Sequence, residues 1–572
     1  IKTFNRVARN FDRFFLNELS EEQWMARTDA FLAVMTDSVI ERALRQQPVE
    51  TQQGGNMERI IRTLKERRNF FKEEMRDYYR FLAQEVNIVG SNDREAFRVE
   101  RRDDGTVHVL VQSLSKDGKI KSRMYERTFD PKVTKEIMLY GLSDDDQFFF
   151  DGQGKSGIKV RAIGGAGSDS FVNNTLHGAL RVYDATFEKN SLTGISSAQS
   201  RLSKDPQVNR YNRLGYKYNL LRPGLSLAYN VDDGLYVGLS LERTRQGFRK
   251  EPYKSRHYLN FTHALATNSS RFRYEGDFTQ VIGHEDLTIR ADIRAPINVT
   301  NFFGFGNNTA FLRNMAEGER YYRVRYDIAD VYVLLRRQLQ SWMRINYGLS
   351  FQYFRVHEQQ NKDHYIDMAG IPGINYETLY KEKFYAGPHF KLDINTQNNK
   401  IIPTRGLLMD LNIRPLIGLN DQSHTVTRAD VDMRIYSSLF RYPRFVLAER
   451  FGYGRVFGKN VEIPQAYYLS GINNLRGYRR DRFAGKSVLY LQSEMRFRIA
   501  DFSTYLFPGS IGLLGFFDVG QVKYPDDPPK GWFAGYGGGI WVAPVKRFVV
   551  TGMLAWSAEE KALPLITFGF PF

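Results

Sequence analysis

The sequence predicts an all-β transmembrane barrel of about 16 antiparallel strands, preceded by an N-terminal α+β region. Three observations support this fold class. From about Gly224 to the C-terminus, segments of roughly 8–20 residues alternate between apolar and polar side chains and are separated by turns. One face of each segment is aromatic or aliphatic, whereas the other carries Arg, Asp, Glu, Ser and Gly, which suits lipid outside and a wet lumen inside. If residues 320–340 form one strand, there are about sixteen segments, and an even strand number is typical of these barrels.

Composition narrows the possible functions. The 572 residues include no cysteine, which excludes disulfides, thiol chemistry and Cys-ligated metal sites. The sequence contains no run of about 18 apolar residues, so no transmembrane helix is predicted. The net charge of +17 indicates either a polyanionic neighbour, such as anionic lipid or lipopolysaccharide phosphate, or a solvated basic face. Nucleic acid is not expected as a partner, because the sequence contains no nucleic-acid-binding motif. The chain opens at Ile1 without a signal-peptide pattern, which predicts a mature form or a fragment.

Residues 1–95 are predicted to be helical. Ser20 precedes Gln23 by three positions, a capping-box spacing that marks the start of a helix, and Pro48 ends the apolar pattern that follows. A second helix is predicted from Met57 to about Val86, because apolar residues recur along one face at helical spacing.

Residues 96–210 are predicted to form short strands that carry a weak internal repeat. Two copies of the pattern G-x-x-x-x-D-x-F, one in GLSDDDQF and one in GGAGSDSF, consist of Gly141, Asp146 and Phe148, and of Gly164, Asp169 and Phe171. A glycine turn, an aspartate that caps it and an aromatic residue that returns to the core are typical of stacked strand–turn units. The second copy is also similar to a calcium-binding nonapeptide, which leaves a calcium site as the alternative to a plain structural turn.

Residues 211–572 are predicted to form the barrel, and the chain ends on an aromatic strand. This strand, LPLITFGFPF, is expected to place three aromatic side chains on one face: Phe568, Phe570 and Phe572. The pattern is similar to the terminal signal of bacterial outer-membrane barrels. Pairing with the first strand, residues 224–231, would cover this edge, and Gly569 and Pro571 would weaken the pairing because proline has no N–H to donate. Two soluble β-sandwiches are the alternative to a barrel.

A long basic loop, LSGINNLRGYRRDRFAG, separates two of the predicted strands. Its centre is the tetrad Leu475, Arg476, Gly477 and Tyr478. Three further elements accompany it: the F-x-D-x-G pattern of Phe516, Asp518 and Gly520, the turn Pro403, Thr404, Arg405 and Gly406, and the carboxylate of Glu494. A loop arginine docked in a narrow lumen must be paired, since an unpaired desolvated charge costs several kcal/mol. A guanidinium can bind a carboxylate in a bidentate manner and fix the loop register.

These motifs resemble those of the BamA/TamA-type superfamily, the bacterial surface antigen domain. The resemblance implies a sixth extracellular loop folded into the lumen, with Arg476 meeting Asp518 on the thirteenth strand or Glu494 on the twelfth. It also implies a periplasmic turn before the ninth strand at residues 403–406 and a periplasmic N-terminal region. The upstream region resembles the linker domain of Bacteroidota members, some of which carry a calcineurin-like phosphoesterase domain further upstream.

The resemblance implies an outer-membrane protein that assists insertion or translocation of other polypeptides, without covalent chemistry, cofactor or metal. Its expected partners are outer-membrane lipid and lipopolysaccharide, client outer-membrane or exported proteins, and periplasmic or lipoprotein subunits. Two alternatives stay open: a transport channel plugged by the loop, and the membrane anchor of an upstream metallophosphoesterase domain. The loop arginines Arg479, Arg480 and Arg482 could contact lipopolysaccharide, line the lumen or be solvated, and the aromatic loop around Phe302, Phe303 and Phe305 is expected to cap the lumen.

Overall fold

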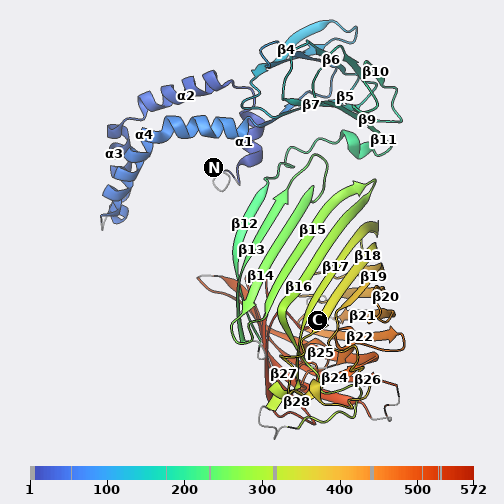
Figure 1. Cartoon of the computed structure of the whole chain (residues 1–572). Helices are drawn as coiled ribbons and strands as arrows, with labels where there is room; N and C mark the ends of the chain where they lie inside the picture. The colour runs from blue at the N-terminus through green and yellow to red at the C-terminus, as the bar shows by residue number, and fades with distance from the viewer. Residues whose placement is uncertain are drawn as a thin grey trace. The chain divides into compact units, whose positions relative to one another are not determined.

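The computed structural model divides the chain into two compact units, Ile1–Tyr218 and Asn219–Phe572 (Figure 1). It describes all residues except 1–4, 6, 53–54, 176, 231–233, 313–317, 439–442, 470, 506, 526 and 528–530. The contacts of the first unit continue past residue 210, where the sequence suggested a boundary. Arg9 Nε donates to the Tyr216 carbonyl oxygen at 2.9 Å, so the segment before Asn219 is fastened to the N-terminal helix.

The first unit begins with helices, as the sequence predicted. These are α1 Arg9–Phe15, α2 Glu21–Val34, α3 Asp37–Arg45, the short 3₁₀ helix η2 Val49–Gln52 and α4 Asn56–Leu82. The Ser20 hydroxyl accepts from the Gln23 N–H at 3.2 Å and the Gln23 side chain accepts from the Ser20 N–H, which completes the capping box. Helix α4 stops at Leu82, short of the predicted end, because the chain then pairs as a strand. Within the described residues, no helix is long and apolar enough to cross a membrane.

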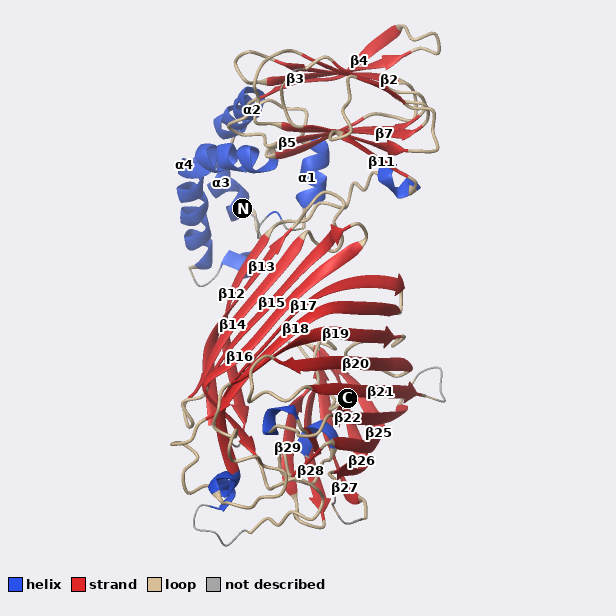
Figure 2. Ribbon diagram, turned by 45° about the vertical axis from the view of Figure 1, so that its right-hand side comes forward, coloured by secondary structure: helices blue, strands red, loops and turns tan. Residues whose placement is uncertain are grey.

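The short strands form two sheets that Figure 2 shows as two layers. One sheet has the order β1-β5-β7-β9-β11 and the other the order β10-β8-β6-β2-β3-β4. Most neighbours are parallel, so the chain passes from one layer to the other and back in successive rungs. The strands are β1 Glu85–Val89, β2 Glu95–Arg101, β3 Val107–Leu114, β4 Ile120–Phe129, β5 Glu136–Ser143, β6 Gln147–Asp151, β7 Lys159–Ala166, β8 Ser170–Asn173, β9 Leu180–Ala185, β10 Ser191–Thr193 and β11 Ser200–Ser203, followed by the 3₁₀ helix η3 Pro206–Asn209.

The sequence repeat corresponds to these rungs. The rings of Phe97, Phe148 and Phe171 stack in the core, with centroids 4.6 Å and 4.8 Å apart. At the turns, a side-chain oxygen of each rung accepts a backbone N–H from the rung before it. Asp146 Oδ1 accepts from Glu95 N at 2.8 Å, and Asp169 Oδ1 accepts from Asp146 N at 2.8 Å. The predicted aspartate caps therefore link rungs rather than close only their own turns.

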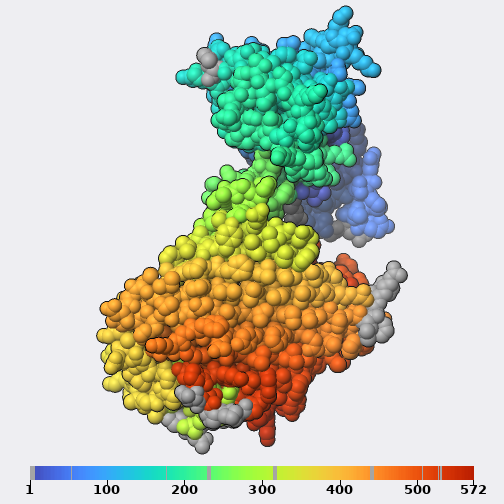
Figure 3. Space-filling view, turned by 90° about the vertical axis from the view of Figure 1, so that its right-hand side faces the viewer, coloured from blue at the N-terminus to red at the C-terminus, as the bar shows by residue number. Residues whose placement is uncertain are grey.

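The second unit is a 16-stranded antiparallel sheet, which confirms the predicted strand number and direction (Figure 1). Its strands follow chain order: β12 Leu220–Asn230, β13 Gly234–Arg245, β14 Ser255–Ala264, β15 Ser270–Ile282, β16 Glu285–Asn301, β17 Arg323–Gln340, β18 Met343–Val356, β19 Lys383–Asn395, β20 Gly406–Gly418, β21 Val426–Ser437, β22 Phe445–Phe457, β25 Ser487–Ser503, β26 Pro508–Lys523, β27 Phe533–Pro544, β28 Val550–Ser557 and β29 Leu563–Phe568. The connections between β16 and β17 and between β18 and β19 include the 3₁₀ helices η4 Gly318–Tyr322 and η5 Tyr365–Asp367. The middle strands, yellow to orange in Figure 3, form a continuous wall.

The two terminal strands of this sheet do not pair in the described part of the chain. Strand β12 pairs only with β13, and β29 pairs only with β28. The barrel therefore has a seam between its first and last strands, where the sequence predicted a weak pairing.

The end of the chain differs from the prediction that its three aromatic residues share one face. Strand β29 stops at Phe568, whose side chain is 86% exposed, and Gly569 then adopts a left-handed φ of 108°. After this bend Phe570 covers the guanidinium of Arg496 at 3.9 Å, and Phe572 is 5% exposed. The left-handed glycine breaks the strand periodicity, so the last two aromatic side chains turn inward while Phe568 faces outward.

Candidate functional site

The long basic loop between β22 and β25 is an ordered plug with secondary structure of its own. It contains the 3₁₀ helix η6 Ile463–Gln465, the short strand β23 Tyr467–Leu469, the helical turn α5 Gly471–Asn474 and the strand β24 Phe483–Gly485, which pairs with β23. Leu475, Arg476 and Tyr478 are almost fully buried. Because β22 and β25 are the eleventh and twelfth strands of the barrel, the loop has the position expected for the sixth loop at this end.

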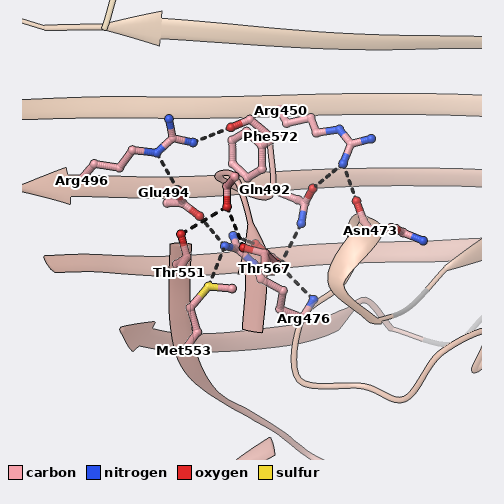
Figure 4. Close-up of polar contacts among 12 residues, drawn as sticks. Arg450, Asn473, Arg476, Gln492, Glu494, Arg496, Thr551, Met553, Thr567 and Phe572 are labelled. Carbon is pink, nitrogen blue, oxygen red and sulfur yellow. Dashed lines mark hydrogen bonds and ion pairs between the residues drawn. The ribbon is translucent and has the colours of Figure 1, made fainter. Parts of the chain in front are cut away.

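Arg476 lies between two buried carboxylates, those of Asp518 and Glu494. Figure 4 shows its contact with Glu494. Its Nε donates to Asp518 Oδ2 at 2.8 Å and its Nη2 to Asp518 Oδ1 at 2.7 Å, a bidentate pair. The backbone N–H of Arg476 also donates to Asp518 Oδ2, at 2.9 Å, and its Nη1 contacts Glu494. All three side chains are 0% exposed. Since the charges have lost their water, these contacts hold the loop in one register.

The arginine belongs to a larger network on the barrel wall. Phe516 lies beneath its guanidinium at 3.8 Å, a cation–π contact. The amide of Gln492 donates to Asp518 Oδ2 at 3.1 Å. On the other side, Glu494 accepts from Arg496 Nε at 2.7 Å, and Arg496 Nη2 donates to the carbonyl oxygen of Phe572 at 2.6 Å (Figure 4). A chain of charge-assisted contacts therefore connects the plug to the end of the chain.

Glycines let the plug approach the wall closely. Gly477 has a left-handed φ of 92°, and a Cβ there would lie 2.5 Å from the Trp556 carbonyl oxygen. On β27, a Cβ at Gly535 would occupy the place of the Arg476 carbonyl oxygen. Gly520 of the F-x-D-x-G pattern faces Leu469, whose Cδ1 would be 2.8 Å from an added Cβ. Gly477 and Gly535 therefore allow backbone to approach backbone, whereas Gly520 leaves room for the side chain of Leu469.

Two further loop arginines are paired with acids that the sequence analysis did not single out. Arg479 Nε donates to Glu560 at 2.7 Å and the same side chain contacts Glu319. Arg482 Nε donates to Glu559 at 2.8 Å. Arg480 lies 3.3 Å from Asp481. The sequence contains one signal that could have suggested these pairs. Two acids are adjacent at Glu559 and Glu560, and two loop arginines are three positions apart at Arg479 and Arg482.

The aromatic loop after β16 also packs around the plug. Phe302 and Phe303 are almost fully buried, and Phe303 lies 5.0 Å from the Arg482 guanidinium carbon. Phe305 stacks on Tyr524 with ring centroids 4.7 Å apart. Strand β16 continues to Asn301, so the aromatic loop begins directly after it.

The turn motif Pro403–Gly406 lies at the other end of the barrel, before the ninth strand β20. Asn398 Oδ1 accepts from the N–H groups of Thr404 and Arg405, both at 3.1 Å. Gly406 starts β20 with a φ of 115°. The strand register separates this turn from the plug by the full length of β20, so the two motifs are not parts of one site.

An Omp85 superfamily domain matches residues 297–550, from the end of β16 to the start of β28. No curated protein matches the sequence. Among solved structures, the chain is similar to BamA from Haemophilus ducreyi lacking POTRA domains 1–3, with 13% identity over 62% of this chain and 69% of that one and a TM-score of 0.45. It is also similar to CdiB from Acinetobacter baumannii, with 12% identity, 61% and 59% coverage and a TM-score of 0.39, and to CdiB from Escherichia coli, with 12%, 61%, 60% and 0.38.

The family match covers the strands that carry the plug, the F-x-D-x-G pattern and Glu494. These residues are the ones on which the sequence resemblance depends. The match identifies residues 297–550, within the 16-stranded antiparallel sheet, as an Omp85 superfamily domain.

Proposed function

We propose that this barrel assists the insertion or translocation of other polypeptides at the outer membrane. The observation that supports this role most directly is the seam, since β12 and β29 share no pairing among the described residues. Each terminal strand therefore offers a row of backbone N–H and C=O groups to an incoming strand. The barrel would act by pairing its edge strand with a strand of the client polypeptide, which needs no covalent chemistry.

The short last strand supports a seam that opens. Strand β29 has six residues, whereas β12 has 11. Gly569 ends β29, and Pro571 has no N–H to donate. A full-length closed pair with β12 would therefore lack partners over almost half of its length, which lowers the free energy needed to separate the two strands.

The plug favours a lateral route over passage through the lumen. Arg476 is fixed by two carboxylates, and Arg479 and Arg482 are paired with acids of the β28–β29 turn and of the loop after β16. The polar lumen lining is the observation that favours the alternative, a plugged channel. In that case Arg476→Ala should raise single-channel conductance in planar bilayers without changing insertion of a client protein.

Partners and placement follow from the same proposal. The clients would be outer-membrane or exported polypeptides, and the first unit would lie in the periplasm, where it could meet periplasmic or lipoprotein subunits. The basic chain, with a net charge of +17, would face anionic lipid and lipopolysaccharide. If the protein carries a phosphoesterase domain, the barrel would also anchor that domain in the membrane.

Locking the seam tests the insertion role. The chain has no cysteine, so a Leu227→Cys and Ile566→Cys pair would supply its only thiols. Both side chains face outward, at 73% and 76% exposure, on β12 and β29. The full chain would be reconstituted in liposomes, treated with short bifunctional maleimides of graded length, and given a urea-unfolded eight-stranded outer-membrane barrel. We expect cross-linking to stop insertion of this client.

The matched control places the pair within a closed part of the wall. Leu241 on β13 and Leu259 on β14 are register partners with exposed side chains. Cross-linking Leu241→Cys to Leu259→Cys should leave insertion unchanged. Undiminished insertion by the seam-locked protein would rule out a lateral route.

A further inference from the structure

We propose that a cationic cavity beside the Pro403–Gly406 turn of the barrel binds the phosphate group of an amphiphilic molecule, one that also has an apolar part. The cavity has a volume of about 280 Å³, is partly open, and is bordered by the turn around Pro403, the start of β22 and parts of β25, β26 and β27. Its chemistry comes from six side chains: Arg444, Arg496, Arg498, Lys546, Trp541 and Phe570. It adjoins the network around the plug through Arg496, which is bonded to Glu494, but Arg476 and Asp518 do not line it.

A buried and incompletely satisfied guanidinium points to an anionic ligand. Arg496 is 3% exposed. Its Nε donates to Glu494 and its Nη2 to the Phe572 carbonyl oxygen, but its buried Nη1 has no hydrogen-bond partner (Figure 4). A buried donor without an acceptor is unfavourable, and a charged donor more so, which makes a bound oxyanion the natural complement of this group.

The other cations around the cavity are only loosely neutralised. Among the described residues that line it there is no aspartate or glutamate. Arg498 and Lys546 lie 3.7 Å and 3.6 Å from Asp501, whose own side chain is half exposed and also accepts from Ser510. Arg444 is exposed beside them. One carboxylate shared between two cations leaves an excess of positive charge, which favours a multiply charged anion such as phosphate.

The remaining wall is apolar, so the ligand should have an apolar part as well as a phosphate group. Trp541 is almost fully buried, and its ring meets that of Phe570 edge to face, with centroids 5.5 Å apart. Ile402 and Pro403 complete this side. A volume of about 280 Å³ is several times the roughly 30 Å³ that one water occupies in the liquid, so a bare ion would leave the apolar side unfilled. A phosphorylated amphiphile matches both halves of the cavity.

Titration of the purified full chain in a non-ionic detergent tests this assignment and separates two sources of phosphate. The probes are inorganic phosphate, dihexanoyl phosphatidic acid below its critical micelle concentration, and dihexanoyl phosphatidylcholine. Isothermal calorimetry should show saturable binding of phosphatidic acid that is tighter than that of inorganic phosphate and much tighter than that of phosphatidylcholine. Equal affinities for phosphatidic acid and inorganic phosphate would overturn the apolar half of the proposal and leave a free-phosphate site.

Variants at the rim decide whether binding occurs in this cavity. Arg498→Gln combined with Lys546→Gln should weaken phosphatidic acid binding about tenfold, whereas Asp501→Asn should tighten it severalfold. Arg455→Gln, on β22 toward the plug end, is the charge-matched control and should leave affinity unchanged. Heat-modifiable mobility on gels would show that each variant is folded. Absence of saturable binding, or equal affinity in the parent and the Arg498/Lys546 variant, would overturn the proposal. The readout is binding, so the outcome is independent of the insertion role.

Discussion

At the scale of single residues, Arg476 shows how a charged side chain can specify a fold at little net gain in stability. Burying a guanidinium and two carboxylates removes their hydration, and the contacts with Asp518 and Glu494 offset that loss. A well-packed apolar triad could be as stable, but it would not select one orientation of the loop. The bidentate geometry and the backbone N–H to Asp518 leave only one register.

Removal of this guanidinium should destabilise the plug strongly. Arg476→Ala leaves Asp518 buried without its paired guanidinium and leaves Glu494 with Arg496 alone. Removing one partner of a buried ion pair typically costs about 3–5 kcal/mol. We expect a lower melting temperature of the detergent-solubilised barrel and higher protease access to residues 471–485. Arg476→Lys should be intermediate, because a lysine keeps the charge but loses the planar fork.

A double substitution isolates the charge effect. Arg476→Ala with Asp518→Asn should recover part of the lost stability, since it removes one of the uncompensated charges. Arg480→Ala, at a more exposed arginine of the same loop, should change the melting temperature little. If Arg476→Ala melted like the parent chain, the buried ion pairs would not hold the plug.

At the scale of elements, the rungs of the first unit bury a ladder of carboxyl groups. Burial raises the pKa of Asp146 to about 9, that of Asp184 to about 7 and that of Asp169 to about 6. One oxygen of each has no hydrogen-bond partner. Glu95 and Glu188 lie in the same cluster, and the pKa of each is raised by burial. The described residues hold no group of three or more acidic, His or Cys side chains that is arranged to bind a metal ion.

The sign of the pH dependence follows from these values. An unfolded aspartate has a pKa of about 3.9, so between that pH and the raised folded values the native rungs bind more protons than the unfolded chain. Their stability is therefore greatest in acid, falls as pH rises above about 4, and stops falling only above the raised pKa values of about 6 to 9. Asn190, which accepts from Asp169 N at 2.9 Å, already fills the equivalent place on the next rung with a side chain that does not ionise.

Asp146→Asn should therefore stabilise the rungs above neutral pH. The amide oxygen can still accept from Glu95 N, while the ionisable group is gone. We expect a gain of about 1–3 kcal/mol at pH 8 and a smaller gain at pH 5. Hydrogen exchange of peptides covering residues 137–172, in the full chain and corrected for intrinsic rates, measures both.

The control is an exposed carboxylate in the same unit. Asp117→Asn, in the β3–β4 turn, should leave these exchange rates unchanged at either pH. If Asp146→Asn slowed exchange, relative to the parent, more at pH 5 than at pH 8, the carboxyl groups would not be protonated as assigned.

The seat of the plug on β27 gives a steric prediction. Gly535→Val would place a Cβ on the Arg476 carbonyl oxygen and should displace the plug. We expect larger single-channel conductance and faster proteolysis of residues 471–485. Gly552→Ala, on the neighbouring strand β28 with no atom within 4 Å of its added Cβ, is the matched control and should behave like the parent. Identical conductance of the two variants would mean that the plug does not depend on this close approach.

At the scale of the whole molecule, the division into two units predicts an independent barrel. Tyr216 is fastened to α1, whereas Asn219 accepts from Gln246 N at 2.6 Å in the barrel. A chain that starts at Asn219 should keep heat-modifiable gel mobility and a β-rich circular dichroism spectrum. A chain that starts at Gly234 lacks β12 and should lose both. Failure of the longer fragment to fold would show that the first unit is needed for barrel assembly.

The barrel could be predicted from the sequence because each strand is marked by a pattern within its own residues. Period-two alternation marks each strand, and the resemblance of the motifs to the BamA/TamA-type superfamily implied that Arg476, Asp518 and Glu494 lie on neighbouring elements. What could not be predicted depends on contacts between distant segments. The pairing of Arg479 and Arg482 with Glu560 and Glu559 joins loops about 80 positions apart. Likewise, alternation alone puts Phe568 and Phe572 on one face, and only the left-handed φ of Gly569 separates them.

The inward turn after Gly569 has a consequence for the behaviour of many copies together. An unpaired strand edge is a template on which a second copy of a protein can add, and long, flat, aromatic edges are the most prone to this. Had the last strand continued to Phe572, it would have lengthened the free edge of β29 and displayed two more phenylalanines there. By folding its last four residues against Arg496 and Trp541 instead, the chain keeps an open seam while limiting self-association in a crowded membrane.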